Sequence, residues 1–413
     1  MIKKKLSNNQ YFSISIVTLI FLFGSYLAIS RGSNFSDGDS YTLILSFLNF
    51  LDFNTYDPSR GAYGHLIPEI LLGSTAYLFG TPISNFICFL FFFSSIYILF
   101  ITFFEKNFTN FATFLLLISS NFYLFTENTN TIDYPIALFF FSLGLFFLKK
   151  ENFIYTSILF SIAICSRASF CVFIYPVIFL YFFQTNITYK KMNLLILTLT
   201  LTTLIGLIFF IPVFYVNNFT LDFLNIPFIT NSNTPGWYGG PPLNFSDLFP
   251  RFLFKVYKLV GSLSSFIIIL IFFFNINVLI SFKTIQQKFI WGVIIINLFL
   301  YFLIPTKILL INPFLIFLYI LLFTHFKKKV IYSIIILNFI TWFISFDLLK
   351  IKYKNDNICE ATVAVSAKFN FSLRQGDYIK FLNSPSLISC YSGAFREYSD
   401  NFINSRPLKL SSK

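Results

Sequence analysis

The chain has few charged residues for its length. Asp, Glu, Lys and Arg make up only 11% of its 413 residues, whereas 56% are hydrophobic and Phe alone occurs 63 times. A soluble protein cannot cover its surface with so few charges, so the composition excludes a water-soluble enzyme, a coiled coil and a disordered chain. We therefore predict an integral membrane protein that crosses the bilayer many times.

Cysteine and histidine are scarce as well. The chain has 5 Cys and 2 His, with no Cys-x-x-Cys pair and no His/Cys cluster, which argues against a structural zinc site. Cys88, Cys165 and Cys171 fall in apolar runs and are expected to be small buried hydrophobic residues. Cys359 and Cys390 lie in the C-terminal region, where they can pair if that region faces an oxidising compartment.

The net charge of +13 is not accompanied by a basic helix or an RNA-binding motif, so we do not expect nucleic-acid binding. In membrane proteins, Lys and Arg instead collect in the cytoplasmic turns. Lys residues at 3–5 precede the first apolar run, and no small-residue cleavage site follows that run. The run is therefore predicted to be an uncleaved first span with a cytoplasmic N-terminus.

Apolar segments of near-spanning length recur along the chain and predict an all-α bundle of about eleven transmembrane helices. The segments are 11–30, 82–103, 107–125, 134–148, 153–165, 170–183, 193–216, 252–275, 290–304, 308–323 and 330–346. Segment 66–80 is instead predicted to be an amphipathic helix on the outer side, because a crossing there would turn the later Lys clusters outward.

The predicted topology divides the chain into a membrane domain, 1–346, and a small extracytoplasmic segment, 347–413. The membrane domain has large outer loops at 31–81 and 217–251. Most acidic residues before the tail fall on the outer side. They are Asp37, Asp39, Asp52, Asp57, Glu69, Glu127, Asp133, Asp222 and Asp247. Because acidic residues hardly set orientation, their clustering indicates a site on the outer face.

A break in the helical pattern is predicted at Ser166-Arg167. The two Lys pairs at 149–150 and 190–191 must be separated by an even number of crossings if both are cytoplasmic. One helix between them would bury Arg167 near mid-membrane, which costs several kcal/mol. Two helices with Arg167 at their outer turn satisfy both constraints.

The first outer loop is the richest in chemically capable side chains. Asp37 and Asp39 follow the first span directly, and Tyr41, Arg60 and His65 come later in the same loop. Asp and Gly are also ordinary turn formers, so a solvated loop is the plain alternative. The Asp pair can act as a base or ligate a divalent cation beside a phosphate. No other cofactor is expected.

Four further residues are candidates. Asp133 opens a predicted span, where Asp commonly caps a helix. Arg167 and Lys307 each place a cation at an outer boundary. Such cations usually snorkel, but converging ones would bind a phosphate. Trp237 lies in a Gly/Pro-rich loop, where it belongs to the interfacial aromatic belt or stacks on a sugar.

The order of these features resembles the GT-C superfamily of membrane glycosyltransferases, which includes protein O-mannosyltransferase-like and lipid A aminoarabinose transferase-like enzymes. The resemblance covers roughly 11–325 and rests on the following residues in this order: Asp39-Ser40-Tyr41, the segment Ser59–His65, Phe79-Gly80, Asp133, Arg167 with Pro176, and Pro305-Thr306-Lys307 with Pro313. Here the first-loop Pro is displaced to Pro68, and the paired Asp leaves open which one is catalytic.

The resemblance implies inverting transfer of a sugar from a polyprenyl-phosphate donor to a lipid, glycan or protein acceptor at the outer face of the cell membrane. We assign the base to Asp39, with Asp37 as the competing choice, and Asp133 to orienting the acceptor or the base. Candidates for the donor phosphate and sugar are Arg60, Arg167, Lys307, His65, Tyr41 and Trp237.

The alternative classes are a transporter or flippase, and a polysaccharide polymerase that handles lipid-linked sugars. A transporter is expected to show internal repeats and ionisable groups at span centres. The sequence shows no clear repeat, and its isolated charges fall at predicted outer boundaries, apart from Lys255 and Lys258, which lie one turn inside 252–275 and can snorkel outward.

Overall fold

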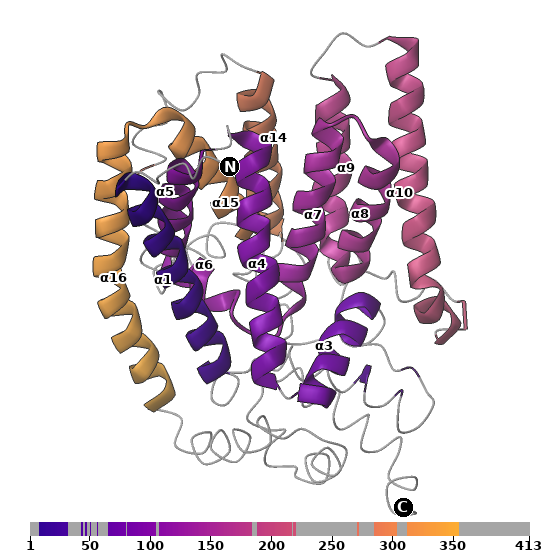
Figure 1. Ribbon diagram of the computed structural model, residues 1–413. Helices are drawn as coiled ribbons and strands as arrows, with labels where there is room; N and C mark the ends of the chain where they lie inside the picture. The colour runs from indigo at the N-terminus through magenta and orange to yellow at the C-terminus, as the bar shows by residue number, and fades with distance from the viewer. Residues whose placement is uncertain are drawn as a thin grey trace, which may run out of the picture.

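The computed structural model describes segments 8–31, 65–79, 81–104, 107–183, 188–216, 285–303 and 312–354, with single residues at 43, 46, 47, 50, 56, 218, 219 and 271. The elements in these segments are all helical and form a bundle (Figure 1). They are α1 (Asn8–Arg31), α3 (Leu66–Phe79), α4 (Thr81–Phe103), α5 (Phe108–Ser119), α6 (Phe122–Glu127), α7 (Asp133–Lys149), α8 (Phe153–Ser166), η1 (Ala168–Phe170), α9 (Cys171–Phe183), α10 (Tyr189–Val216), α14 (Ile285–Leu303), α15 (Asn312–His325) and α16 (Lys328–Lys354).

The bundle is that of a helical membrane protein. Three described stretches are long and apolar enough to cross a bilayer: Asn9–Ile29, Pro82–Phe103 and Tyr189–Val216. Shorter apolar helices, including α5, α8 and α9, pack beside them. Every predicted span overlaps a described helix except 252–275, which lies almost entirely outside the described residues. The described helices do not by themselves fix the number of crossings.

Two helix breaks shape the bundle. The first separates α8 from η1 and α9 at Arg167, whose extended backbone confirms the predicted two-helix arrangement. The second was not predicted and divides the expected span 107–125 into α5 and α6. There the Asn121 side chain caps α6 by accepting the Leu124 N–H at 3.0 Å. A side-chain cap of this kind satisfies a backbone group that the break would otherwise leave unpaired.

The segment predicted to be an amphipathic helix forms α3, which is an apolar helix. The predicted tail begins inside a helix. In Figure 1, α3 lies obliquely across the lower end of the bundle, beside the start of α4. It buries Leu72 and Ala76 and exposes Leu78 and Phe79. The last helix, α16, runs to Lys354 and so continues past the predicted boundary at 346.

Aromatic packing ties neighbouring helices of the bundle together. Phe114 and Phe104 each meet Phe323 edge-on, with ring centroids 5.4 and 5.0 Å apart, which ties α5 and the end of α4 to α15. Lipid tails are as apolar as these rings, so helix association in a bilayer depends on close packing and on polar contacts between helices.

Helices α8 and α10 are joined by a ladder of small polar side chains. The hydroxyl groups of Ser157 and Ser161 donate to the backbone carbonyls of Thr198 and Thr202 at 3.2 and 2.7 Å. One turn further along, the Cys165 thiol lies 3.5 Å from the Gly206 carbonyl. Because both partners advance by four residues at each step, the ladder fixes how α8 and α10 align along their axes.

A neutral polar network lies at the α5–α6 break. Tyr319 on α15 accepts hydrogen bonds from the amide groups of Asn121 (3.0 Å) and Asn338 (3.3 Å). Asn338 also donates to the Ser120 hydroxyl at 3.0 Å, and the Trp342 indole N–H donates to the Ser120 carbonyl at 2.7 Å. The network therefore attaches the break to both α15 and α16 through fully buried groups.

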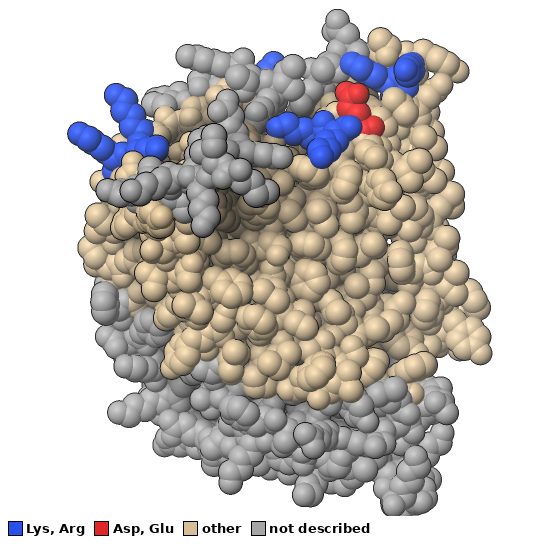
Figure 2. Space-filling view, in the orientation of Figure 1, with Lys and Arg blue, Asp and Glu red and all other residues tan. Residues whose placement is uncertain are grey.

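The described Lys side chains gather at one end of the bundle, which is the upper end in Figure 2. They sit at the end of α7, the start of α10, near the start of α14, and in the α15–α16 turn. These residues are Lys149, Lys150, Lys190, Lys191, Lys288, Lys327, Lys328 and Lys329. All are exposed except Lys191, which is half-buried. We call this the lysine end.

Candidate functional site

Three of the predicted site residues, His65, Asp133 and Arg167, lie in the described part of the chain, and the structure brings them together. The other predicted site residues fall outside the described residues: Asp37, Asp39, Tyr41, Arg60, Trp237 and Lys307. Asp133 and Arg167 belong to helix ends that lie opposite the lysine end. A rise of 1.5 Å per residue places Asp133 about 24 Å from Lys149, at the other end of α7.

Asp133 starts α7 but does not act as its cap. The N-cap position belongs to Ile132, whose side chain makes no capping bond, so the capping role predicted for Asp133 is wrong. Its carboxylate lies in the first helical turn, where the helix dipole favours a negative charge. Its Oδ2 atom faces two partners from other elements.

The first partner is Arg167, in the turn between α8 and η1. Its Nη1 donates to Asp133 Oδ2 at 2.6 Å, and its guanidinium lies 3.7 Å from the centroid of the Tyr134 ring. Asp133 is fully buried and Arg167 is 7% exposed. A buried charge is tolerated only when it is paired, and Asp133 and Arg167 compensate each other's charge. The Tyr134 ring, which stacks on the guanidinium, fixes the orientation of the Arg167 side chain.

The second partner is His65, directly before α3. Its Nε2 lies 3.4 Å from Asp133 Oδ2, and its side chain is 5% exposed. The contact becomes an ion pair when the imidazole is protonated. His65, Asp133 and Arg167 thus come from three separate regions of the sequence and meet at one carboxylate oxygen. We call them the Asp133 cluster.

The turn before α7 is anchored to two other helices, and this fixes Asp133. Asn85 Oδ1 on α4 accepts hydrogen bonds from both the N–H and the hydroxyl of Thr131, each at 2.6 Å. The Asn85 side-chain amide in turn donates to the Ala28 carbonyl of α1 at 3.1 Å. The Cys88 thiol, one helical turn along α4, lies 3.4 Å from the Ile132 carbonyl. These bonds set the position of the first turn of α7.

Glu69 was not among the predicted site residues, yet it borders the cluster. This carboxylate is 1% exposed and accepts hydrogen bonds from the His65 backbone N–H at 2.8 Å and from the Tyr56 hydroxyl at 2.6 Å. The spacing from His65 to Glu69, with an acidic residue in the first turn of a helix, resembles the reach-back of a capping box and is the signal that could have indicated it.

Arg167 retains hydrogen-bonding capacity. Its Nε–H is buried and has no partner among the residues that the structure describes. A guanidinium offers five N–H donors in a planar fork that matches a phosphate or carboxylate. The arrangement can therefore hold an anionic or hydroxylated ligand through directed N–H groups, while Asp133 neutralises most of the Arg167 charge.

No metal centre occurs among the described residues, because they contain no group of three or more His, Cys, Asp or Glu side chains that could hold an ion. Both of the paired carboxylates that were predicted as possible cation ligands, Asp37 and Asp39, lie outside the described part of the chain.

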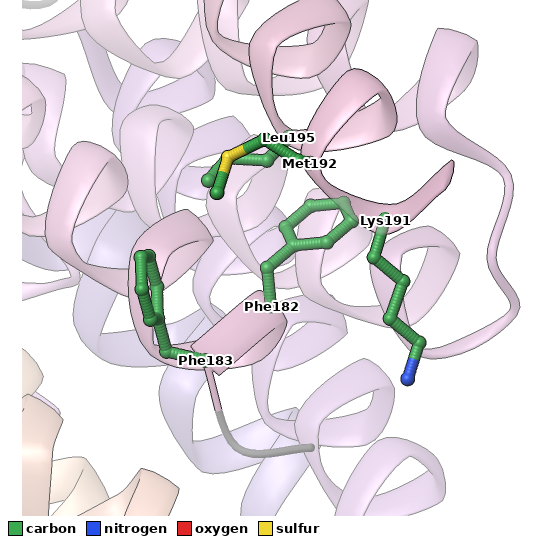
Figure 3. A pocket seen from close by; sticks show the side chains of 5 residues that line it. All are labelled: Phe182, Phe183, Lys191, Met192 and Leu195. Atoms are coloured by element: carbon green, nitrogen blue, oxygen red, sulfur yellow. The ribbon is translucent and has the colours of Figure 1, made fainter. Parts of the chain in front are cut away.

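A shallow hollow lies at the lysine end, away from the Asp133 cluster. The last residues of α9, Phe182 and Phe183, and the first turns of α10 line it (Figure 3). Met192 and Leu195 add to its apolar wall, and Lys191 stands at its edge with the amino group directed away from the rings. Its empty volume is about 170 Å³, part of it open to the surroundings. The hollow has no carboxylate or hydroxyl in its lining and offers no group for the predicted chemistry.

Comparison of the chain with models of protein families, with curated proteins and with solved structures found no match.

Proposed function

We propose that the chain is a membrane glycosyltransferase of the GT-C type, which moves a sugar from a polyprenyl-phosphate donor to a lipid, glycan or protein acceptor. The meeting of His65, Asp133 and Arg167 carries this proposal. These residues were selected from the order of motifs along the sequence. Asp133 Oδ2 lies 3.4 Å from His65 Nε2 and 2.6 Å from Arg167 Nη1.

The location of the cluster favours an enzyme over a transporter. Asp133 is the first residue of α7, Arg167 follows the last residue of α8, and His65 precedes α3. Asp133 lies about 24 Å along α7 from Lys149, which is beyond the middle of a hydrocarbon core of roughly 30 Å, whereas the substrate sites of transporters lie near the membrane midplane.

The proposed topology has about eleven crossings and follows from the distribution of charge. The exposed lysine end would face the cytoplasm, by the positive-inside rule. The Asp133 cluster would then face the outer side of the cell membrane, together with the loops 31–81 and 217–251 and the segment 347–413.

The reaction needs a base and a stabilised leaving group. In the proposed step, the acceptor hydroxyl oxygen attacks the anomeric carbon and gives its proton to Asp39, or to Asp37 as the alternative. The bond from the anomeric carbon to the phosphate oxygen breaks, its electron pair leaves with the polyprenyl phosphate, and the configuration inverts. General base catalysis of this kind contributes about 10²–10⁴-fold.

The ion pair sharpens the roles assigned to the cations. Since Asp133 already neutralises Arg167, we assign Arg167 to a directed hydrogen bond to the donor. Most of the positive charge that stabilises the departing phosphate is assigned to Arg60 and Lys307. His65 is assigned to the sugar or phosphate, and Tyr41 and Trp237 to the sugar.

The test is transfer from a panel of labelled polyprenyl-phosphate sugars by the full-length protein in proteoliposomes. We expect transfer by the wild type and a loss of at least about 10²-fold in Asp37→Asn/Asp39→Asn, consistent with the loss of a general base. Glu151→Gln, which changes an exposed acidic residue at the lysine end, is the matched control.

Two results would overturn the proposal. One is full activity in the Asp37→Asn/Asp39→Asn variant. The other is movement of the labelled lipid between leaflets with no transfer of its sugar to any acceptor, which would indicate a flippase.

A further inference from the structure

Glu69 is a buried carboxylate that the proposed chemistry does not use. It sits in the first turn of α3 and is 1% exposed. Burial of a carboxylate costs free energy unless hydrogen-bond donors compensate it. Hydrogen-bond donors bind both oxygen atoms of Glu69.

The first oxygen of Glu69 fixes the residue before α3. Oε1 accepts the backbone N–H of His65 at 2.8 Å, while the His65 carbonyl accepts the Glu69 backbone N–H at 2.9 Å. This reciprocal pair closes the N-terminus of α3 and determines the backbone position from which the His65 ring projects. The negative charge lies at a helix N-terminus, where the dipole stabilises it.

The second oxygen reaches the first outer loop. Oε2 accepts the Tyr56 hydroxyl at 2.6 Å, a short bond of the kind that a charged acceptor makes. A continuous polar connection therefore runs from Tyr56 through Glu69 to His65. From His65 it continues to Asp133 and Arg167, so that it joins the loop, α3, α7 and the α8–α9 turn.

We propose that Glu69 is a positioning residue, which fixes the His65 ring against Asp133 and holds the Tyr56 hydroxyl at the N-terminus of α3. This role rests on the proposed function. Since a displacement of about 1 Å at a reacting centre can cost 10²-fold in rate, we expect Glu69→Ala to lower the turnover number about 10–10²-fold. Glu69→Gln should restore most of it, because the amide oxygen still accepts the His65 N–H.

The position of His65 can be measured without any activity assay. The chain has only two His residues, and the second, His325, ends α15 next to the lysine end, where it contacts Gln287. Diethylpyrocarbonate modifies accessible imidazoles, and mass spectrometry resolves the two sites. We expect His65 to react slowly in the wild type and in Glu69→Gln, and at least about 10-fold faster in Glu69→Ala, with His325 as the internal reference.

Equal His65 reactivity in the wild type and in Glu69→Ala, at constant His325 reactivity, would overturn the proposal. If His325 also becomes more reactive, the Glu69→Ala substitution has unfolded the bundle. The experiment is then repeated with the Glu69→Asp variant. Asp keeps the charge but is one methylene shorter, so His65 alone should react faster, and no change at His65 would again overturn the proposal.

Activity then separates this proposal from the proposed function. A wild type that transfers no sugar from any donor would refute the function and leave the modification experiment to decide the position of His65. An active wild type whose Glu69→Ala variant is equally active would refute the positioning role alone. If Glu69 acts through His65, the double variant Glu69→Ala/His65→Ala should be no slower than the slower single variant. If the two residues act independently, the fold reductions in rate of the two single variants should multiply in the double variant.

Discussion

The two ends of the bundle use charged residues in opposite ways. At the lysine end, the Lys side chains are exposed, apart from the half-buried Lys191. Their contacts include that of Lys149, which donates to the Thr102 carbonyl of α4, and that of Lys150 over the Phe146 ring at 4.2 Å. At the other end, His65, Asp133 and Arg167 are buried and share one carboxylate oxygen. Exposed charges act through their number and sign, whereas each buried charge depends on a particular partner.

The largest effect is expected from breaking the buried pair. Arg167→Met removes the main partner of Asp133 and should lower the free energy of unfolding by about 3 kcal/mol, near the lower end of the range for broken buried pairs, because His65 remains beside the carboxylate. Unfolding in mixed micelles with increasing SDS measures it. The double variant Asp133→Leu/Arg167→Met should be more stable than Arg167→Met alone. A double variant that is less stable would contradict the pairing argument.

An intermediate effect is expected between the two ends, where the neutral network lies. Tyr319→Phe removes the oxygen that accepts the amide N–H groups of Asn121 and Asn338, and should cost about 1–3 kcal/mol in the same titration. Tyr332→Phe, on the exposed face of α16, is the control and should change little. Equal losses in both variants would mean that the network contributes nothing particular to stability.

The smallest effect is expected at the lysine end. Lys190→Ala and Lys328→Ala each remove one exposed charge and should alter the free energy of unfolding by no more than about 0.5 kcal/mol. The same SDS titration checks both variants. A loss as large as that of Arg167→Met would remove the contrast between the ends.

Much of the helix arrangement is predictable from the sequence, because apolar runs between charged turns mark helices directly. The break at Arg167 is predictable for the same reason, since the cost of a mid-membrane guanidinium decides it. The α5–α6 break is not predictable in this way, because the mean hydropathy of an apolar run does not reveal a side chain, such as that of Asn121, which caps a helix within the run. Its signal is the short polar run Ser119-Ser120-Asn121.

The candidate site is predictable only in part. Motif order selects His65, Asp133 and Arg167, but the position of Asp133 at the start of a predicted span also indicates helix capping, because a sequence does not show which long-range partner competes for a carboxylate. Glu69 is missed because segment 66–80 was used only to decide whether the chain crosses the membrane there. The role of Glu69 depends on contacts with Tyr56 and His65, which the sequence does not show.

The ladder between α8 and α10 has a consequence for the surrounding lipid. At 1.5 Å per residue, the apolar part of α10, residues 193–216, extends over about 36 Å, compared with roughly 30 Å of hydrocarbon in a typical bilayer. The helix cannot adjust to the bilayer by sliding along α8, because Ser157, Ser161 and Cys165 hold its register. Tilting of α8 and α10 together would accommodate the difference. The two helices are therefore expected to respond to a change in bilayer thickness as one unit.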